Sequence, residues 1–317
     1  MKGLILAGEP MGLLIAQSEG ALGSVTGYDL AVAGAEFNVA VGVARLGHRV
    51  TYMTKLGRDP FGDRIIHVLN ENKIGTEFVA WSDEKRTGFM LKGRVREGDP
   101  PIFYFRAGSA ASTLAPADVE AIDFSAYSHI HLTGILPALT DTTRAAVLLM
   151  FERARKAGLT ISFDPNLRPQ LWPDERTMRE TINDLASRAD IVLPGTAEGK
   201  ILMGSDDPAA IAAFYQERGA KIVITKCGSA GAYVADGAAH YHVPGFRVRK
   251  VVDTVGAGDG FAAGVITGLM EELPLAEAVR RAAAIGAIQV MSRGDNEGLP
   301  TREELDTFMK EADSSDE

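Results

Sequence analysis

The stretch DTVGAGDGF, residues 253–261, joins two carboxylates through small residues and leads into an apolar, helix-like run. Glycine adopts the backbone conformations that close approach to a ligand requires. The N–H groups of Gly256, Ala257 and Gly258 can therefore point into one concavity, toward which the following helix directs its positive N-terminal end. Such a concavity would stabilise the negative charge on a phosphoryl group during its transfer. A glycine-rich start of a helix is the plainer interpretation of the same residues.

Asp259 is the carboxylate that follows these small residues. It could accept a proton from an attacking hydroxyl group. It could equally cap the helix as an ordinary N-terminal carboxylate. The local sequence leaves both interpretations open.

Two common phosphate-binding motifs are absent. The pattern G-x-G-x-x-G would need glycine where Phe261 stands, and a P-loop would need Ser or Thr where Ile201 follows Lys200. A nucleotide would therefore have to be bound by another arrangement.

Two segments far apart in the chain, AGAEFNVAVGVARLG at 33–47 and DTVGAGDGF, together resemble the ribokinase-like, PfkB-type carbohydrate kinases. The resemblance extends over essentially the whole chain. In that family the last aspartate of the second motif is the catalytic base and the preceding glycines form the anion hole, which implies these roles for Asp259 and for residues 256–258. The first motif contacts the sugar, which implies contacts from Gly34 and Asn38.

Within that family, the segments FYFRAGSAAS and SFDPNLRPQLW resemble the kinases of 2-keto-3-deoxygluconate. The resemblance implies that Tyr104 and Arg106 bind a sugar acid, that Arg168 reaches both phosphate and substrate, and that Asp295 contacts a sugar hydroxyl. Guanidinium groups suit a carboxylate at one end of a substrate and a phosphate at the other. Burying two unpaired guanidinium groups beside a neutral sugar would be costly. Phe89 stands where a sugar-contacting tyrosine is common, so the identity of the sugar stays open.

A neutral sugar is the alternative substrate, because fructokinases share much of FDPNLR. A fructokinase or ribokinase-type activity therefore remains open. A non-catalytic, sugar-binding regulator on a kinase scaffold is an alternative of another class. The presence of Asp259 argues against it.

The resemblance places ATP along TKCGSAG, residues 225–231. It implies nucleotide contacts from Asn166, Thr225, Lys226, Gly228 and Gly231, besides those from the glycines at 256 and 258. Glycines there let the backbone approach the nucleotide closely.

Magnesium is the second expected cofactor, because phosphoryl transfer needs a divalent ion that bridges the phosphates. LPGTAEGKIL resembles the family's N-x-x-E element, which implies that Glu198 organises magnesium through water. Gly195 replaces the usual asparagine of that element. Asp253 is a second candidate for contact with the metal.

The elements that must position these residues follow an α/β pattern. Short β-rich runs alternate with helical patterns, which predicts a three-layer α/β/α sandwich around a mainly parallel sheet. Two segments, 13–34 and 87–112, have strand composition without a helix between the strands, and we expect them to pair into a small β-sheet lid. Residues 1–312 are expected to form a single ribokinase-like domain, followed by a disordered acidic tail at 313–317. The core strands are expected at 2–8, 50–57, 129–134, 159–166, 191–195 and 221–228, a hairpin at 224–245, and the helices at 36–47, 60–75, 140–158, 177–189 and 207–220 and over most of the chain after 260.

Composition restricts the partners. The net charge of −9 and the lack of a basic face argue against nucleic acid as a partner. We find no signal-peptide pattern and no apolar run long enough to span a bilayer, so we expect a cytoplasmic protein without a membrane partner. The single cysteine, Cys227, is interpreted as an inert, buried side chain. An exposed lid sheet would have an apolar face and unpaired edges, so we expect a homodimer or a higher homo-oligomer.

Histidine pairs offer one further alternative. His129 and His131 lie on one face of a strand, as do His240 and His242, which could indicate a metal-dependent hydrolase. No further His/Asp/Glu cluster at the strand ends completes such a site, so we interpret these residues as packing or surface histidines.

Overall fold

A nine-stranded sheet forms the centre of the computed structural model, which describes residues 2–95 and 100–315. Its strand order is β13-β12-β11-β10-β9-β8-β1-β4-β5, and all neighbours are parallel except β11-β12 and β12-β13. The strands are β1 (Gly3–Ala7), β4 (Val50–Gly57), β5 (Gly75–Ser82), β8 (Tyr127–Thr133), β9 (Thr160–Asp164), β10 (Ile191–Val192), β11 (Ile222–Lys226), β12 (Gly231–Asp236) and β13 (Ala239–Pro244).

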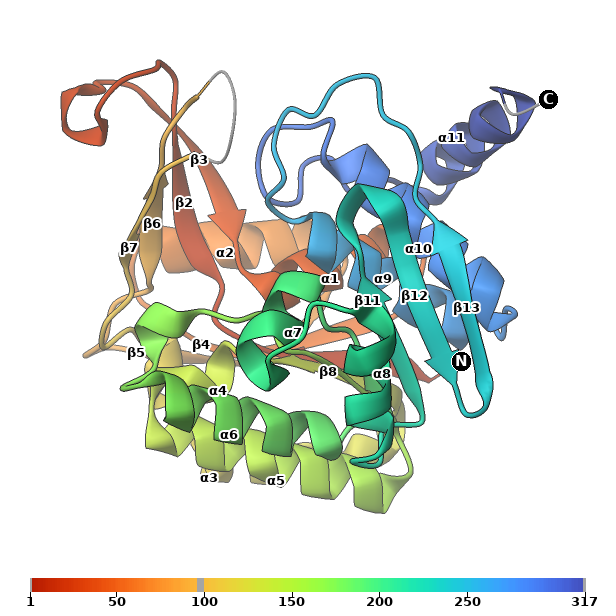
Figure 1. The fold of residues 1–317 in the computed structure, drawn as a ribbon. Coiled ribbons are helices and arrows are strands. Elements are labelled where there is room, and N and C mark those ends of the chain that lie inside the picture. The colour runs from red at the N-terminus through yellow and green to blue at the C-terminus, as the bar shows by residue number, and fades with distance from the viewer. Residues whose placement is uncertain (1, 96–99, 316–317) are drawn as a thin grey trace.

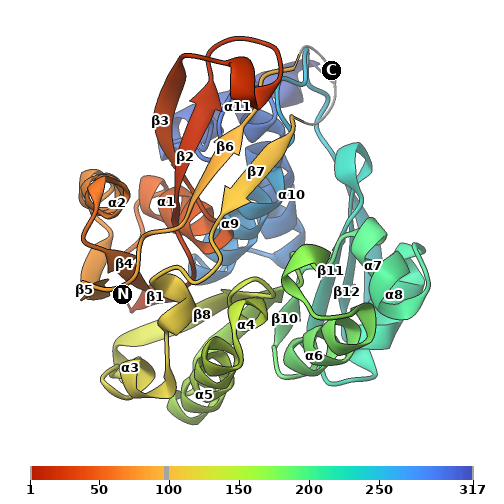
Figure 2. The same ribbon diagram turned by 90° about the vertical axis from the view of Figure 1, so that its left-hand side faces the viewer.

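Helices cover both faces of this sheet (Figures 1 and 2). One apolar cluster packs α3 to α8 against one face, and a second packs α1, α2, α9, α10 and α11 against the other. The three-layer sandwich expected from the sequence is confirmed. The helices are α1 (Ala35–Arg45), α2 (Pro60–Glu71), α3 (Pro116–Glu120), α4 (Leu136–Leu139), α5 (Asp141–Ala157), α6 (Glu175–Ser187), α7 (Thr196–Met203), α8 (Pro208–Gln216), α9 (Ala257–Met270), α10 (Leu275–Gln289) and α11 (Arg302–Ser315).

A second sheet of four strands stands beside the first, at the upper left of Figure 1. Its order is β3-β2-β6-β7, with β2 (Met11–Ala16), β3 (Tyr28–Ala33), β6 (Phe89–Lys92) and β7 (Ile102–Phe105). The two segments that the sequence singled out therefore pair, through a parallel contact between β2 and β6. Positions 96–99 of the second segment lie outside the described residues. We call this sheet the lid sheet.

Several features differ from the sequence-based expectation, which did not include the short helices α3, α4 and α7. Strand β5 was not predicted, because it is an edge strand whose residues are all half-buried except Glu77, which is exposed, so it lacks an alternating apolar pattern. The predicted tail is helical as far as Ser315, since α11 continues through 313–315. The start of α11 is fixed by Glu304, whose carboxylate accepts hydrogen bonds from the backbone N–H and the hydroxyl of Thr301. Positions 316–317 lie outside the described residues.

Within the described ranges, no helix is both long and apolar enough to cross a membrane.

Candidate active site

Parallel strands deliver their carboxyl ends to one edge of the main sheet, and a polar cavity of about 330 Å³ lies there. Asp164 ends β9, and Asn166 and Arg168 follow it. Lys226 ends β11. All four side chains line the cavity, which the lid sheet borders through Met90, Ile102 and Tyr104.

Asp259 lies in the first turn of α9 and lines this cavity. Its Oδ2 accepts a hydrogen bond from Asn38 Nδ2 at 2.7 Å, and its Oδ1 accepts from Asn166 Nδ2 at 3.3 Å. Burial raises the pKa of Asp259 to about 7; Asn38 opposes the rise, Asp164 adds to it, and Arg168 and Lys226 oppose it. A carboxylate with a pKa near neutrality suits a general base. Its two oxygens accept from side-chain amides, and within the described residues neither accepts a backbone N–H of the first turn, so the hydrogen bonds agree with a general base better than with a cap.

The turn before Asp259 is glycine-dependent. Gly256 is the N-cap of α9 with φ +81°, and a Cβ there would lie 2.0 Å from the carbonyl oxygen of Asp295. Within the described residues no side chain caps α9, and the N–H of Ala257 makes only a long bond, of 3.4 Å, to the carbonyl of Thr254. Gly256 and Gly258 line the polar cavity at this positive end of the helix, which suits an anion, and we call residues 256–258 the anion-binding turn.

A buried ion pair lies opposite this turn. Lys226 Nζ donates to Asp164 Oδ2 at 2.5 Å and lies 3.7 Å from the Cβ position of Gly258. Glu198 is close to this pair, and burial raises its pKa, with Lys226 opposing and Asp164 adding to the shift. Both Glu198 oxygens accept backbone N–H groups, from Leu167 at 2.9 Å and from Gly195 at 2.7 Å. Gly195, the departure noted in the sequence, thus contributes its backbone N–H.

Asn38 and Gly34 both line the cavity, as predicted for sugar contacts, and both also have local tasks. Asn38 Oδ1 accepts from Asn296 Nδ2 at 3.0 Å, which fixes the amide that binds Asp259. Gly34 is the N-cap of α1 with φ +144°, and a Cβ there would meet the carbonyl oxygen of Glu9 at 2.9 Å.

Arg106 and Tyr104 both line the cavity, but the structure corrects the charge argument for Arg106. Arg106 pairs with Glu9, whose Oε2 accepts from Nε at 2.7 Å, and Ser109 donates to the other Glu9 oxygen. Its charge is therefore already balanced. Arg168 differs, because its Nη1 donates to the carbonyl of Leu167 at 2.8 Å and it forms no ion pair in the described part of the chain.

Two predicted site residues do not reach a cavity. Phe89 lies on the outer face of the lid sheet, stacked between Phe61 and Phe105 at centroid distances of 5.1 and 4.6 Å. Its neighbour Met90 faces the cavity instead, because side chains alternate along a strand. Thr225 is fully buried, and its hydroxyl points to the carbonyl of Pro208 rather than to a nucleotide.

Asp253 and Asp295 share one partner. Lys92 Nζ lies 2.5 Å from Asp253 Oδ2 and 2.9 Å from Asp295 Oδ1. Asp295 borders the polar cavity, whereas Asp253 lies outside its lining. The structure therefore gives no support for a metal contact from Asp253, because its carboxylate pairs with Lys92 and is not part of the lining of the polar cavity.

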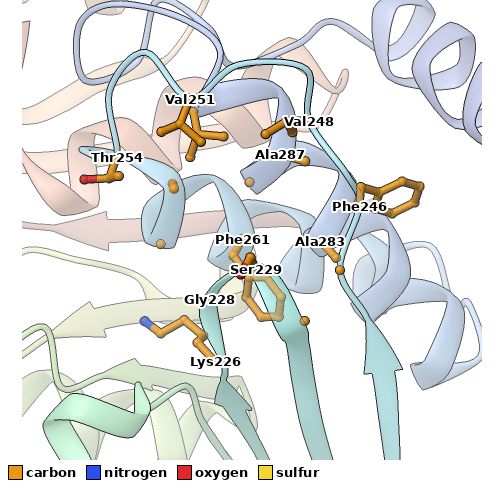
Figure 3. Close-up of a pocket in the computed structure, with 16 residues that line it drawn as sticks. Lys226, Gly228, Ser229, Phe246, Val248, Val251, Thr254, Phe261, Ala283 and Ala287 are labelled. Atoms are coloured by element: carbon orange, nitrogen blue, oxygen red, sulfur yellow. The ribbon is translucent and has the colours of Figure 1, made fainter. Parts of the chain in front are cut away.

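A second cavity of about 330 Å³ adjoins the first and shares Lys226, Thr254 and Gly258 with it. Figure 3 shows Lys226 and Thr254 at one side of it and Phe246 and Ala283 at the other. Gly228 and Gly231 line it, as predicted for the nucleotide, together with an apolar wall of Phe246, Val248, Val251, Phe261, Ala283, Ala287 and Val290. Apolar walls of this kind suit the faces of an aromatic base.

Sequence reasoning missed three carboxylates near the site: Glu9, Glu36 and Asp164. The position of Asp164 at the end of a buried strand was a usable signal. Glu36 lies within the first motif, accepts from Thr133 Oγ1 at 2.6 Å, and has its pKa raised to about 7, mainly by burial. Nothing local distinguishes Glu9, whose partner Arg106 is distant in the chain.

The structure excludes the hydrolase alternative for the first histidine pair. His129 Nε2 and His131 Nδ1 both contact Ser162 Oγ at 2.8 Å inside the core, and burial lowers both pKa values to about 3. His240 and His242 lie on the exposed edge strand β13. In the described ranges, no group of three or more His, Cys, Asp or Glu side chains could hold a metal ion.

A family model for pfkB carbohydrate kinases matches residues 2–302. The chain belongs to the pfkB family of carbohydrate kinases. Its two cavities meet at Lys226, Thr254 and Gly258, directly beside Asp259, which is the arrangement a kinase needs.

Curated relatives share this family. The 2-dehydro-3-deoxygluconokinase of Bacillus subtilis (strain 168) is 47% identical over 95% of this chain and 94% of its own length. The enzyme of the same name from Thermoproteus tenax is 32% identical over 98% and 95%. Fructokinase-2 of Solanum lycopersicum is 30% identical over 91% and 90%.

Solved structures agree with the fold. A PfkB protein from Polaromonas sp. JS666 superposes with a TM-score of 0.88 at 43% identity, covering 96% of this chain and 99% of the other. A protein of E. coli assigned to ribokinase II, solved with ATP and Mg²⁺, gives a TM-score of 0.89 at 26% identity, covering 98% and 100%. The ribokinase-like fold expected from the sequence is confirmed.

Proposed function

We propose that this carbohydrate kinase transfers the γ-phosphoryl group of ATP to a hydroxyl of 2-keto-3-deoxygluconate, the sugar acid also called 2-dehydro-3-deoxygluconate. The main support for this reaction is the position of Asp259, which is buried where the polar cavity meets the anion-binding turn. The identity of 47% with the Bacillus enzyme of that name supports the choice of sugar.

The reaction follows from the side chains that line the two cavities. Asp259 takes the proton of the attacking hydroxyl while the oxygen forms a bond to the γ-phosphorus and the bond to the β-phosphate oxygen breaks. The N–H groups of the anion-binding turn and the ammonium group of Lys226 stabilise the charge on the transferring group. ADP then leaves from the apolar cavity.

Arg168 supports the choice of a sugar acid as the substrate. Its guanidinium group lines the polar cavity, is partly buried, and lacks a carboxylate partner within the described residues. A carboxylate of the substrate would balance that charge through charge-assisted hydrogen bonds. Tyr104, Asn38 and Asp295 border the same space and would contact the sugar hydroxyls.

The residues near Glu198 fit a magnesium ion held mainly by phosphate oxygens and water. The described part of the chain forms no cage of three protein ligands, but Glu198 and Asp164 place two carboxylates beside the cavity, and burial raises the pKa of Glu198. Mg²⁺ is commonly held by one or two carboxylates plus substrate phosphates. When bound, it would neutralise charge on the ATP phosphates. Glu198 would act through water, because both of its oxygens bind backbone N–H groups.

A neutral-sugar kinase is the second candidate, and one observation favours it. Glu9 already balances Arg106, so this arginine alone does not demand an acidic substrate. A coupled ADP-release assay with Mg·ATP and matched concentrations of 2-keto-3-deoxygluconate, fructose and ribose separates the candidates. We expect kcat/KM for the acid to exceed that for fructose by about 10²-fold, the worth of one well-placed charge-assisted contact and its desolvation. Faster turnover of fructose would assign the protein to the second candidate.

The lid sheet supports a homodimer. Leu30, Leu14, Leu91 and Phe103 lie opposite one another in register across its four strands, on the face away from the cavity. Phe103 is 61% exposed and Leu30 is 44% exposed. Such an apolar face is an association site on a protein of this kind. Light scattering should give twice the chain mass at micromolar concentration and the single-chain mass for Phe103→Asp; a monomeric native protein would contradict the dimer.

A further inference from the structure

A buried lysine of the lid sheet, Lys92, reaches across to the loops that build the anion-binding turn. It lies at the end of β6, two residues after Met90, so both side chains project from the same face of the strand. Met90 borders the polar cavity, whereas Lys92 extends to Asp253 and Asp295. Lys92 is only 2% exposed. One short strand thus contacts both the sugar side of the site and the loops behind the anion-binding turn.

Both carboxylates that Lys92 binds are connected to the turn. Asp253 Oδ1 accepts the N–H of Val255 at 3.0 Å, directly before Gly256. The carbonyl oxygen of Asp295 packs against Gly256 so closely that a Cβ there would lie 2.0 Å away. Moving either carboxylate would therefore move the turn.

The loop of Asp295 also reaches the base. Asn296 donates to Asn38 Oδ1 at 3.0 Å, and Asn38 donates to Asp259 at 2.7 Å. Gln289 Nε2 adds a second connection, to the carbonyls of Val255 at 3.3 Å and Gly294 at 2.9 Å. The anion-binding turn and the base thus depend on one packed loop region, which contacts the lid sheet through the ion pair of Lys92 and through a hydrogen bond from Asn296 Nδ2 to the carbonyl of Val32 at 2.8 Å.

The charges make this contact hard to replace. One ammonium group faces two buried carboxylates, so its removal leaves two anions without a counter-charge. Burial opposes the charge on Lys92, but the two aspartates outweigh it and hold the pKa of Lys92 above its usual value. The lysine therefore stays charged at all pH values at which a kinase of this kind works.

We propose that Lys92 is a positioning residue for phosphoryl transfer: its ammonium group ties the lid sheet to Asp253 and Asp295 and thereby holds the anion-binding turn and Asp259 in their reactive arrangement. The inference rests on the proposed kinase function. The ammonium group itself touches neither sugar nor nucleotide in this role, but its partner Asp295 borders the polar cavity, so the diagnostic quantity is kcat at saturating sugar. A misplacement of the reacting groups by about 1 Å can lower a rate on the order of 10²-fold.

The test is steady-state kinetics of Lys92→Met, with Lys55→Met as the matched control. Lys55 also forms a largely buried ion pair, to Asp118 at 2.6 Å, but lies outside both cavities. We expect kcat of Lys92→Met at saturating sugar to fall on the order of 10²-fold while KM for ATP changes by less than about threefold. The control should keep kcat within about twofold of the native value. A native-like kcat for Lys92→Met would overturn the proposal, as would a loss that appears mainly in KM.

A second variant covers the case in which Lys92→Met does not fold. Lys92→Met/Asp253→Asn removes one buried charge of each sign, so the net charge of the cluster is unchanged, and the amide oxygen still accepts from Val255. The same loss of kcat is expected, and a native kcat in this folded variant would overturn the proposal.

Chemical rescue separates the charge of Lys92 from its packing. Lys92→Ala removes the atoms that propylammonium can restore, and a cavity of about 130 Å³ lined by Lys92 and Asp253 gives a route to the site. We expect propylammonium to raise kcat of this variant at least about fivefold and 1-propanol to leave it unchanged, a difference of about 1 kcal/mol. Equal effects of both compounds, or none from either, would contradict the role of the charge.

Turnover of the wild-type protein in the same assay separates a failure of the proposed function from a failure of the inference about Lys92. An inactive wild type contradicts the proposed function, and with it the inference. An active wild type with unchanged Lys92 variants contradicts the inference alone.

Discussion

The two cavities are of equal volume, about 330 Å³ each, and opposite in chemistry. The apolar cavity is lined mostly by apolar residues of α9, α10 and the loop after β13, including Phe246 and Phe261, and the polar side chains of Lys226 and Thr254 lie where it meets its neighbour. Charged side chains that line the polar cavity form ion pairs, such as Lys226 with Asp164 and Arg106 with Glu9. Apolar packing tolerates small changes in shape, whereas a buried charge without its partner is costly. Substitutions in the apolar cavity should therefore change mainly the KM for ATP. The loss of a charge in the polar cavity should instead change turnover or the KM for the sugar.

The largest expected effect concerns the base. Asp259→Asn keeps the shape of the side chain but cannot accept a proton, so kcat should fall by a factor on the order of 10² to 10⁴. The melting temperature and the KM for ATP should change little, because the neighbouring cavity is untouched. Turnover at saturating sugar and Mg·ATP measures this. A stability loss with nearly normal kcat would show instead that Asp259 is a cap.

Two glycines provide a matched pair across the two cavities. Gly256→Ala places a Cβ 2.0 Å from the Asp295 carbonyl, whereas Gly228→Ala, also at positive φ (+59°), meets no atom within 4 Å. We expect Gly256→Ala to lower kcat at least about tenfold and stability by more than about 1 kcal/mol. Gly228→Ala should cost about 1 kcal/mol of stability and raise the KM for ATP a few-fold. Urea unfolding and initial rates measure both, and similar effects in the two variants would remove the contrast.

Arg168→Met tests the acid preference of the polar cavity. The KM for 2-keto-3-deoxygluconate should rise on the order of tenfold, because a charge-assisted hydrogen bond contributes about 1.5 to 3 kcal/mol. The KM for fructose, which has no carboxylate, should change by less than about threefold. An equal rise for both sugars would mean that Arg168 serves the phosphates alone.

The smallest effect is expected on the apolar side. Phe246 lines the nucleotide cavity and also contacts Arg280 and Phe308, with centroid distances of 5.3 and 5.5 Å. Phe246→Ala should raise the KM for ATP about threefold to tenfold through the loss of about 1 kcal/mol of packing, and leave kcat at saturating ATP unchanged. A loss of kcat would place Phe246 in the reacting arrangement and weaken the division between the cavities.

The sequence predicted the parts of this site that depend on short motifs. The spacing of small residues indicated the anion-binding turn, and the resemblance to the family implied the roles of Asp259 and Asn38, because one turn or one helix start holds each of these residues. The paired lid segments and the parallel sheet followed from apolar periodicity and chain order.

The parts that the sequence did not predict depend on partners distant in the chain. The pairing of Arg106 with Glu9 spans 97 positions, and that of Lys92 with Asp295 spans 203. Neither is visible before the lid sheet is placed against the main sheet. Phe89 was assigned to the sugar pocket because a sugar-contacting tyrosine is common at its position in the resembling kinases. The face that it occupies on its short strand is set by register, which sequence alone specifies weakly.

The pH dependence of kcat/KM for the sugar is the most direct test of the central claim, that the buried Asp259 is the base of the polar cavity. Its pKa of about 7 means that the carboxyl is protonated, and cannot accept the hydroxyl proton, in most molecules below neutrality. The account predicts that kcat/KM rises about tenfold per pH unit from pH 5 to 6.5 and levels off above pH 7.5. A profile that is flat from pH 5 to 8 in a folded, active enzyme would contradict it.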